Sequence, residues 1–124
     1  MCTSASVWND DNFTIENNQI TLSTPINNIK KITLPATKLM PWQHALEYAY
    51  LLEKRGYWKI PNIDELQTVL KIYGILGINN EIRNPVWSRT QTAENPFDKA
   101  LDFSNNQVLN KDKNEPLEVI CIHY

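Results

Sequence analysis

The chain is poor in cysteine, in long apolar runs and in excess charge. Its two cysteines are too few for the disulfide framework of a small secreted domain. It has no run of the roughly 20 apolar residues that cross a bilayer, and no basic segment followed by an apolar one at its start. Its 12 basic residues nearly balance its 14 acidic ones, so the net field is too weak to attract nucleic acid. We therefore expect no transmembrane segment and no nucleic-acid partner.

Apolar and aromatic residues are plentiful enough for one core. The 124 residues are 42% hydrophobic and include four Trp and five Tyr. A polar, turn-prone cluster occupies residues 9–12. We predict a flexible N-terminal tether over residues 1–12 and a single domain over residues 13–124, which begins with an N-terminal extension to about residue 38.

The segment from Gly56 to Leu66 combines a helix end, a short strand and a new helix start. Gly56 can adopt the positive φ that ends a helix. The aromatic run around Trp58 favours an extended chain, and Pro61 keeps the residue before it out of the helical region. Glu65 follows three residues after an asparagine, and this spacing is typical of a capping box. The segment therefore predicts a strand between two helices.

Apolar spacing predicts the extent of these helices. Residues 41–56 keep the spacing of one helical face and begin with a proline, which suits a first turn. Residues 63–73 carry a second apolar stripe, and Gly74 is the expected stop of that helix. Before them, alternating residues predict a hairpin of strands 13–15 and 19–22, followed by a strand at 29–34.

After residue 85 the pattern changes to strands and loops, so the chain as a whole predicts an α+β fold. Residues 110–116 are expected to form a charged loop, and the terminal strand is expected to be buried on both faces. The predicted strands cover residues 86–90, 100–103, 108–109 and 117–122.

Several of these motifs resemble one bacterial domain family. The string Gly56-Tyr-Trp58-Lys-Ile-Pro61 with Glu65-Leu66 is similar to its GWRLPT-x-x-EL signature, and Trp87-Ser88-Arg89-Thr90 is similar to its WSST. The family has no assigned function and is found at the C-terminus of a collagen-like adhesin of Legionella. The positions expected to pack as structural motif residues are Trp42, Ala45, Gly56, Trp58, Pro61, Glu65, Leu66, Trp87, Ser88 and Thr90.

This resemblance covers the chain from about residue 39 to its end and implies a C-type-lectin-like fold. Such a fold packs two helices on short antiparallel sheets and brings the N- and C-terminal strands close together. The chain departs from the family at Lys59, where the family has arginine. Because lysine cannot make a planar, bidentate contact, we expect the ion pair near Glu65 to be weakened or moved to solvent.

The cysteines and histidines form no catalytic motif. The family's usual disulfide cannot form, so we expect Cys121 to be a buried free thiol, with a bond to Cys2 as the less favoured alternative. His44 and His123 have no motif partner, and the sequence predicts neither an enzyme, nor a metal site, nor a cofactor. A pocket that held His44 or Cys121 with a second titratable group would reopen the enzyme hypothesis.

A polar connector after Trp87 is the expected recognition surface. Mixed polar side chains on a loop above a rigid scaffold suit binding better than catalysis, although an ordinary solvated loop is an equal alternative. The candidate ligand-binding residues are Arg89, Gln91, Glu94, Asn95, Asp98 and Lys99. The WND triplet of calcium-dependent lectins occurs at residues 8–10, where it lacks the partner motif that those lectins use.

The leading hypothesis is a non-enzymatic binding module of the bacterial envelope or cell surface. It would recognise a protein, or else a glycan, through the loops after Trp87. The alternative is a periplasmic inhibitor or immunity-type lipoprotein that blocks a toxin or hydrolase. Cys2, followed by small polar residues, is a candidate lipid anchor, and an ordinary frayed terminus is the other interpretation of this start. The expected location is the periplasm, the outer membrane as a lipoprotein, or the cell surface.

Overall fold

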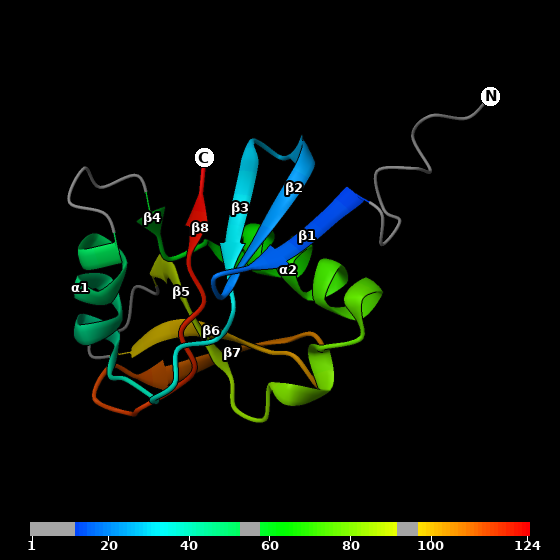
Figure 1. Ribbon diagram of the computed structural model, residues 1–124. Helices are drawn as coiled ribbons and strands as arrows, with labels where there is room; N and C mark the ends of the chain where they lie inside the picture. The colour runs from blue at the N-terminus through cyan, green and yellow to red at the C-terminus, as the bar shows by residue number, and fades with distance from the viewer. Residues whose placement is uncertain (1–11, 53–57, 92–96) are drawn as a thin grey trace.

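The computed structural model describes residues 12–52, 58–91 and 97–124, with only the backbone described at residues 91 and 97. Within these ranges the fold is α+β, with two α-helices and two antiparallel sheets (Figure 1). The elements are β1 (Phe13–Glu16), β2 (Gln19–Ile26), β3 (Ile29–Thr33), α1 (Trp42–Leu52), β4 (Trp58–Lys59), α2 (Ile63–Leu76), the 3₁₀ turn η3 (Asn79–Glu81), β5 (Val86–Gln91), β6 (Phe97–Asp102), β7 (Gln107–Asp112) and β8 (Ile122–His123).

The larger sheet has five strands in the order β1-β2-β3-β8-β4. Asn17–Asn18 and Asn27–Asn28 form the turns that join its first three strands, and their φ angles lie between 52° and 69°. Asparagine tolerates this left-handed region because its short side chain can bond locally. The hairpin predicted across Asn17–Asn18 is therefore confirmed. The residues predicted to form an N-terminal extension supply three of the sheet's strands.

The last strand lies inside this sheet. Ile122 of β8 pairs with Ile32 of β3 on one side and with Lys59 of β4 on the other. The N-terminal strands and the C-terminal strand are therefore neighbours, as the sequence predicted. Because β8 separates β3 from β4, the sheet is continuous only when the end of the chain is in place.

Both helices begin where their sequence signals predict. Trp42, Ala45 and Ala49 form the buried stripe of α1, whose expected stop lies outside the described residues. In α2 the Asn62 side chain accepts from the Glu65 N–H at 2.8 Å, and Glu65 accepts from the Asn62 N–H at 2.9 Å. This reciprocal pair confirms the capping box.

The predicted end of α2 is wrong by about one turn. Gly74 lies within the helix, and Gly77 ends it with a left-handed φ of 74° and an N–H directed at the carbonyls of Gly74 and Tyr73. Both glycines are exposed, so local geometry alone distinguishes them. Gly77 is the residue that needs the positive φ.

The smaller sheet has the order β5-β6-β7. Every residue of β6 has a cross-strand partner in β7, from Phe97 opposite Asp112 to Asp102 opposite Gln107. The loop predicted from residue 110 is therefore wrong at its start, since residues 110–112 continue the strand. Polar residues occupy this stretch because β7 is an edge strand whose side chains are all exposed or half-buried.

Residues 117–121 are buried, as predicted, but they do not form the regular strand that the sequence suggested. Their backbone bonds to several segments in turn. Leu117 exchanges two hydrogen bonds of 2.9 Å with Met40, Glu118 bonds to the residues around β5, and Cys121 accepts from Thr33 at 2.8 Å. Since no single neighbour follows the whole segment, only residues 122 and 123 form a ladder.

The buried side chains form two clusters on either side of this C-terminal segment. One joins α2 to the larger sheet and to β5 and β6, and the other surrounds Trp42, Trp58 and Trp87 beneath α1. Figure 1 shows α1 and α2 on opposite sides of the red C-terminal segment, with the smaller sheet below it. The segment therefore links the two packed halves of the fold.

Candidate functional site

The motif tryptophans are core residues. Trp42, Trp58 and Trp87 are 9%, 5% and 0% exposed and share one cluster. The indole N–H of Trp42 donates to the Ser88 carbonyl at 3.0 Å, and that of Trp87 donates to the Met40 carbonyl at 2.8 Å. These two reciprocal bonds fix the start of α1 to β5, because a buried indole N–H needs an acceptor.

The strand β5 is also fastened to the segment before α2. The Arg89 N–H donates to the Pro61 carbonyl at 3.0 Å, and the Thr90 hydroxyl accepts from the Ile63 N–H at 3.0 Å. On its other side, the buried Ser88 hydroxyl donates to the Lys99 carbonyl of β6 at 2.7 Å. The motif residues of the two strings therefore meet in one structural unit.

Arg89 is occupied within the protein. Its guanidinium lies 3.0 Å from the Glu65 carboxylate and donates to the Ile60 carbonyl at 2.8 Å and to the Tyr124 hydroxyl at 2.8 Å. Tyr124 in turn donates to the other oxygen of Glu65 at 2.5 Å. The pKa of Tyr124 is raised by burial and by this bond to Glu65. The arginine fork joins β5, α2 and the chain end.

Two expectations are corrected by this network. Arg89 does not lie free on a recognition loop, since the donors of its fork face internal acceptors. Glu65 has an ion pair although position 59 is a lysine, because Arg89 of β5 supplies the guanidinium. Lys59 is exposed, with its Nζ 5.9 Å from the centroid of the Tyr124 ring. The arginine in the string Trp87-Ser88-Arg89-Thr90 was the only sequence signal for this ion pair.

Asp98, also expected on the recognition surface, is 0% exposed. Its Oδ1 accepts from the Lys99 N–H at 2.8 Å, and its Oδ2 has no hydrogen-bond partner among the described groups. Burial raises the pKa of Asp98, and the Lys99 N–H and the Lys113 ammonium oppose that rise. Asp98 is buried next to the half-buried Lys99 on β6, so it is not available to a ligand at the surface.

The other candidates do not gather into a described surface. Lys99 is half-buried and reaches the Asn110 side chain at 3.4 Å. Glu94 and Asn95 lie outside the described residues, as does the side chain of Gln91. The recognition role predicted for the connector after Trp87 therefore finds no geometric support in Arg89 or Asp98, and the connector itself remains a prediction.

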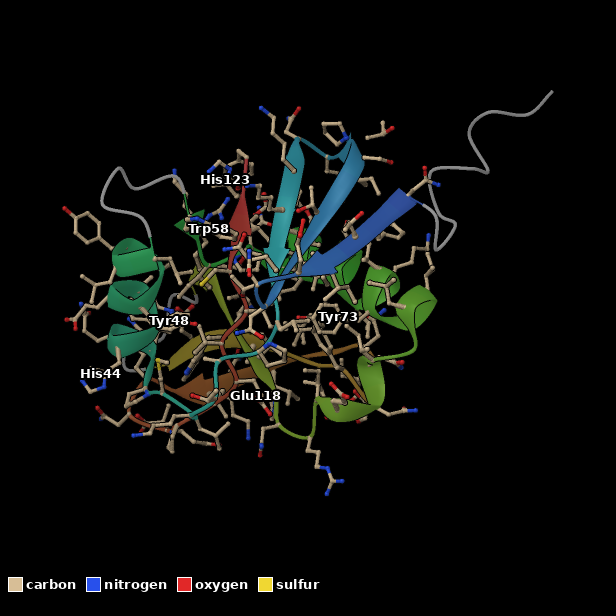
Figure 2. All side chains as sticks on the ribbon, viewed as in Figure 1. His44, Tyr48, Trp58, Tyr73, Glu118 and His123 are labelled. Carbon is tan, nitrogen blue, oxygen red and sulfur yellow. The ribbon has the colours of Figure 1, made fainter. Side chains whose placement is uncertain are left out.

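The nucleophile and base candidates lie apart. His44 projects from the outer side of α1, whereas His123 lies well above it in the view, beside Trp58 (Figure 2). The ring centroids of His123 and Trp58 are 5.1 Å apart. Cys121 is a buried free thiol, as predicted, and burial raises its pKa to about 12. Such a thiol is protonated and unreactive at neutral pH. Cys2 and the residue 8–10 triplet lie outside the described residues.

An exposed apolar surface on α1 was missed by the sequence reasoning. We define the α1 apolar face as Leu46, Tyr50 and Leu51; Tyr50 is 59% exposed and Leu51 is 70% exposed. Beside it lies a groove of about 280 Å³, whose lining includes Trp58 and Ile60. The apolar spacing of the helix was treated as one buried stripe, although its residues extend onto a second face.

A larger cleft of about 640 Å³ opens on the other side of α1. Its walls come from the β1–β2 turn, the segment between β3 and α1, the inner side of α1, η3 and the C-terminal segment. The charged residues that line it are Lys38, Glu81 and Glu118. We call it the Glu118 cleft. No sequence motif marked it, because its residues come together only in the folded chain.

Neither described helix is long and apolar enough to cross a membrane. Among the described residues, no group of three or more His, Cys, Asp and Glu side chains is arranged to hold a metal ion. No protein-family model matches the chain, and a search of curated proteins finds no significant match.

Proposed function

We propose that the chain is a non-enzymatic binding module that recognises a partner protein through the α1 apolar face. The observation that carries the proposal is the exposure of Tyr50 and Leu51 on one helix, next to a groove. Large apolar side chains that gather on a surface mark sites of association more often than singly scattered ones do. Tyrosine is also enriched at the centres of protein interfaces.

The groove indicates the chemistry of the partner. Leu46, Ala49 and Ile60 give it apolar walls, so it would hold an aliphatic or aromatic side chain. Lys59 and Arg89 add positive charge to its lining, and Arg89 is partly balanced by Glu65. A partner segment with an apolar anchor flanked by an acidic residue therefore matches both the shape and the charge of the groove.

The proposal includes a C-type-lectin-like fold and kinship with the adhesin-type domain. Both are supported by the contact between the WSRT string and the Pro61 segment. They are also supported by the proximity of the terminal strands. That kinship supports a location in the bacterial envelope or at the cell surface. The inhibitor or immunity-type lipoprotein differs only in the identity of the partner.

The test is site-specific photocrosslinking in bacterial envelope extract and, separately, on host matrix. A photoreactive phenylalanine at position 50 should capture a protein, whereas the same group at the exposed Val108 of β7 should not. The double variant Tyr50→Ser/Leu51→Ser should weaken capture at least about tenfold, and Val108→Ser should leave it unchanged.

The captured protein separates the two versions of the function. A single bacterial enzyme bound in a one-to-one complex supports the inhibitor, and a matrix or surface protein supports the adhesin-type module. Equal capture by the wild type and the double variant would show that the α1 apolar face is not the binding surface. A crosslink only to a second copy of the chain, or a ligand that is only a glycan, would refute the proposal that the partner is another protein.

A further inference from the structure

Glu118 is a buried carboxylate with little to compensate its charge. The residue is 9% exposed, and its Oε2 lies 3.5 Å from the Asn84 amide, which is a long hydrogen bond. No described cationic group lies within ion-pair distance of either oxygen. No described oxygen of Glu118 is both buried and without a hydrogen-bond partner, so the oxygen that Asn84 does not bond is open to the cleft. A positively charged ligand in the cleft could therefore reach the carboxylate and pair with it.

The position of Glu118 is set by the backbone. Its N–H donates to the Pro85 carbonyl at 3.0 Å, and its carbonyl accepts from the Trp87 N–H at 3.0 Å. These bonds form the parallel bridge between Val86 and Glu118. Glu118 thus belongs to the rigid centre of the fold, and its side chain lines the cleft from there. Figure 2 shows it in the lower centre of the molecule, with Tyr48 between α1 and that centre.

The walls of the Glu118 cleft suit an amphipathic cation. Leu34, Pro35 and Met40 supply apolar surface for a methylene chain. Tyr48 also lines the cleft, and its pKa is raised by burial and by Cys121, so its hydroxyl stays protonated and can donate or accept a hydrogen bond. Glu81 adds a second carboxylate at the side where η3 borders the cleft.

The charge count specifies a single cation. Glu81 and Glu118 line the cleft with one lysine, Lys38, so its charged residues contain one more carboxylate than ammonium groups. Lys38 is exposed and would repel a second positive group near the entrance. The lining therefore favours one monovalent cation over a divalent ion, which would need more carboxylates.

We propose that the Glu118 cleft binds the guanidinium group of an arginine side chain from another polypeptide. A guanidinium is less strongly hydrated than an ammonium and meets a carboxylate through a planar, two-pronged contact, so it suits a buried glutamate better than lysine does. Its planar face can also lie against Tyr48. This site is separate from the α1 apolar face, and its test does not depend on the function proposed above.

The direct test is a titration of ¹⁵N-labelled protein with arginine capped at both ends, followed by NMR. The amide signals of Asn18, Lys38 and Glu118 should shift, with a dissociation constant of about 1 mM for a ligand of this size. Capped citrulline has the same shape without the charge and should bind at least about tenfold more weakly. Equal binding of the two probes would overturn the proposal.

A matched pair of variants locates the contact. Glu118→Gln should weaken the binding of capped arginine at least about tenfold, whereas Glu47→Gln, on the outer side of α1, removes the same charge and should change nothing. If Glu118→Gln fails to fold, Glu81→Lys, at an exposed position, should abolish binding. Retained binding of capped arginine in these Glu118 and Glu81 variants would show that the Glu118 cleft is not the binding site.

The source of the guanidinium is tested with free arginine. Its charged amino and carboxyl groups are absent from a residue within a polypeptide, so free arginine should bind more weakly than the capped form. Free arginine that binds at least as well as the capped form would assign the cleft to a small molecule and overturn the polypeptide source.

Discussion

The side chain of Arg89 joins three separate segments of the fold, and no sequence motif predicted these contacts. Its side chain is 35% exposed, yet it reaches a glutamate of α2, a carbonyl before Pro61 and the hydroxyl of Tyr124. Glu65 uses the same carboxylate for the capping box and for the ion pair. The start of α2 and the position of β5 therefore depend on one shared network.

Replacement of Arg89 should reveal this dependence. Arg89→Ala should lower the free energy of unfolding by about 1–3 kcal/mol, because Glu65 keeps its burial and loses its cation. Arg89→Lys should recover only part of the loss, since lysine lacks the fork. Urea denaturation measures both variants. Arg83→Ala, at an exposed arginine, is the control and should stay within about 0.5 kcal/mol of the wild type. Equal effects at the two positions would refute the network.

Asp98 makes the stability of the folded state depend on pH. Burial raises its pKa, so the folded state binds its proton more tightly than the unfolded state does. Stability from this group is therefore present at acid pH and is lost as the pH rises above the ordinary value of 3.8. Relative to the wild type, Asp98→Asn should therefore have a higher free energy of unfolding at pH 7 than at pH 3. Urea denaturation at the two pH values measures this difference.

Asp102 provides a control of opposite sign on the same strand. The Ser104 hydroxyl and N–H donate to its carboxylate at 2.7 Å and 2.9 Å, and these bonds lower its pKa. Its contribution is present above the ordinary pKa and is lost as the pH falls through the lowered value. Relative to the wild type, Asp102→Asn should therefore have a lower free energy of unfolding at pH 7 than at pH 3. The same sign for both variants would contradict the assignment.

At the scale of elements, two exposed glycines three residues apart have different roles. Gly74 lies inside α2, and Gly77 ends it with a φ of 74°. Neither has a heavy atom within 4 Å of the position that a Cβ would occupy, so packing does not distinguish them. The backbone conformation alone decides what a side chain would cost at each position.

Alanine at these positions should change stability in opposite directions. Gly74→Ala should raise the free energy of unfolding by about 0.5–1 kcal/mol, because alanine is the better residue in a helix interior. Gly77→Ala should lower it by about 1 kcal/mol, because a Cβ is strained at this φ. Thermal unfolding of the two variants measures the difference. A stabilised Gly77→Ala would show that the helix ends elsewhere.

Local signals predicted the elements, and contacts between distant residues set most of their limits. The Asn62 capping box and the Asn17–Asn18 turn were predictable, because each is complete within a few residues. The length of β7 and the irregular course of residues 117–121 depend on partners elsewhere in the chain. For the same reason, the Arg89 network and the Glu118 cleft could not be read from the sequence.

At the scale of the whole molecule, the C-terminal segment is the common neighbour of both halves. The N–H groups of Leu117, Glu118 and Cys121 bond to Met40, Pro85 and the Thr33 hydroxyl. Opening any of these bonds requires the core clusters around the segment to separate. The segment should therefore exchange its amide hydrogens only when the protein unfolds globally.

Native-state hydrogen exchange tests this expectation. The amides of Leu117, Glu118 and Cys121 should give an exchange free energy equal to the global free energy of unfolding from urea denaturation. Amides of the edge strand β1 that face solvent should exchange at lower free energy through local opening. Exchange of the 117–121 amides well below the global value would show that the segment detaches on its own.

The insertion of β8 between β3 and β4 has a consequence for synthesis in the cell. While the ribosome still holds Ile122 and His123 in its exit tunnel, β3 and β4 each present an unpaired edge. The main sheet is thus complete only after Ile122 and His123 have left the tunnel. Any factor that shields open strand edges would act on this protein during translation, before β8 emerges.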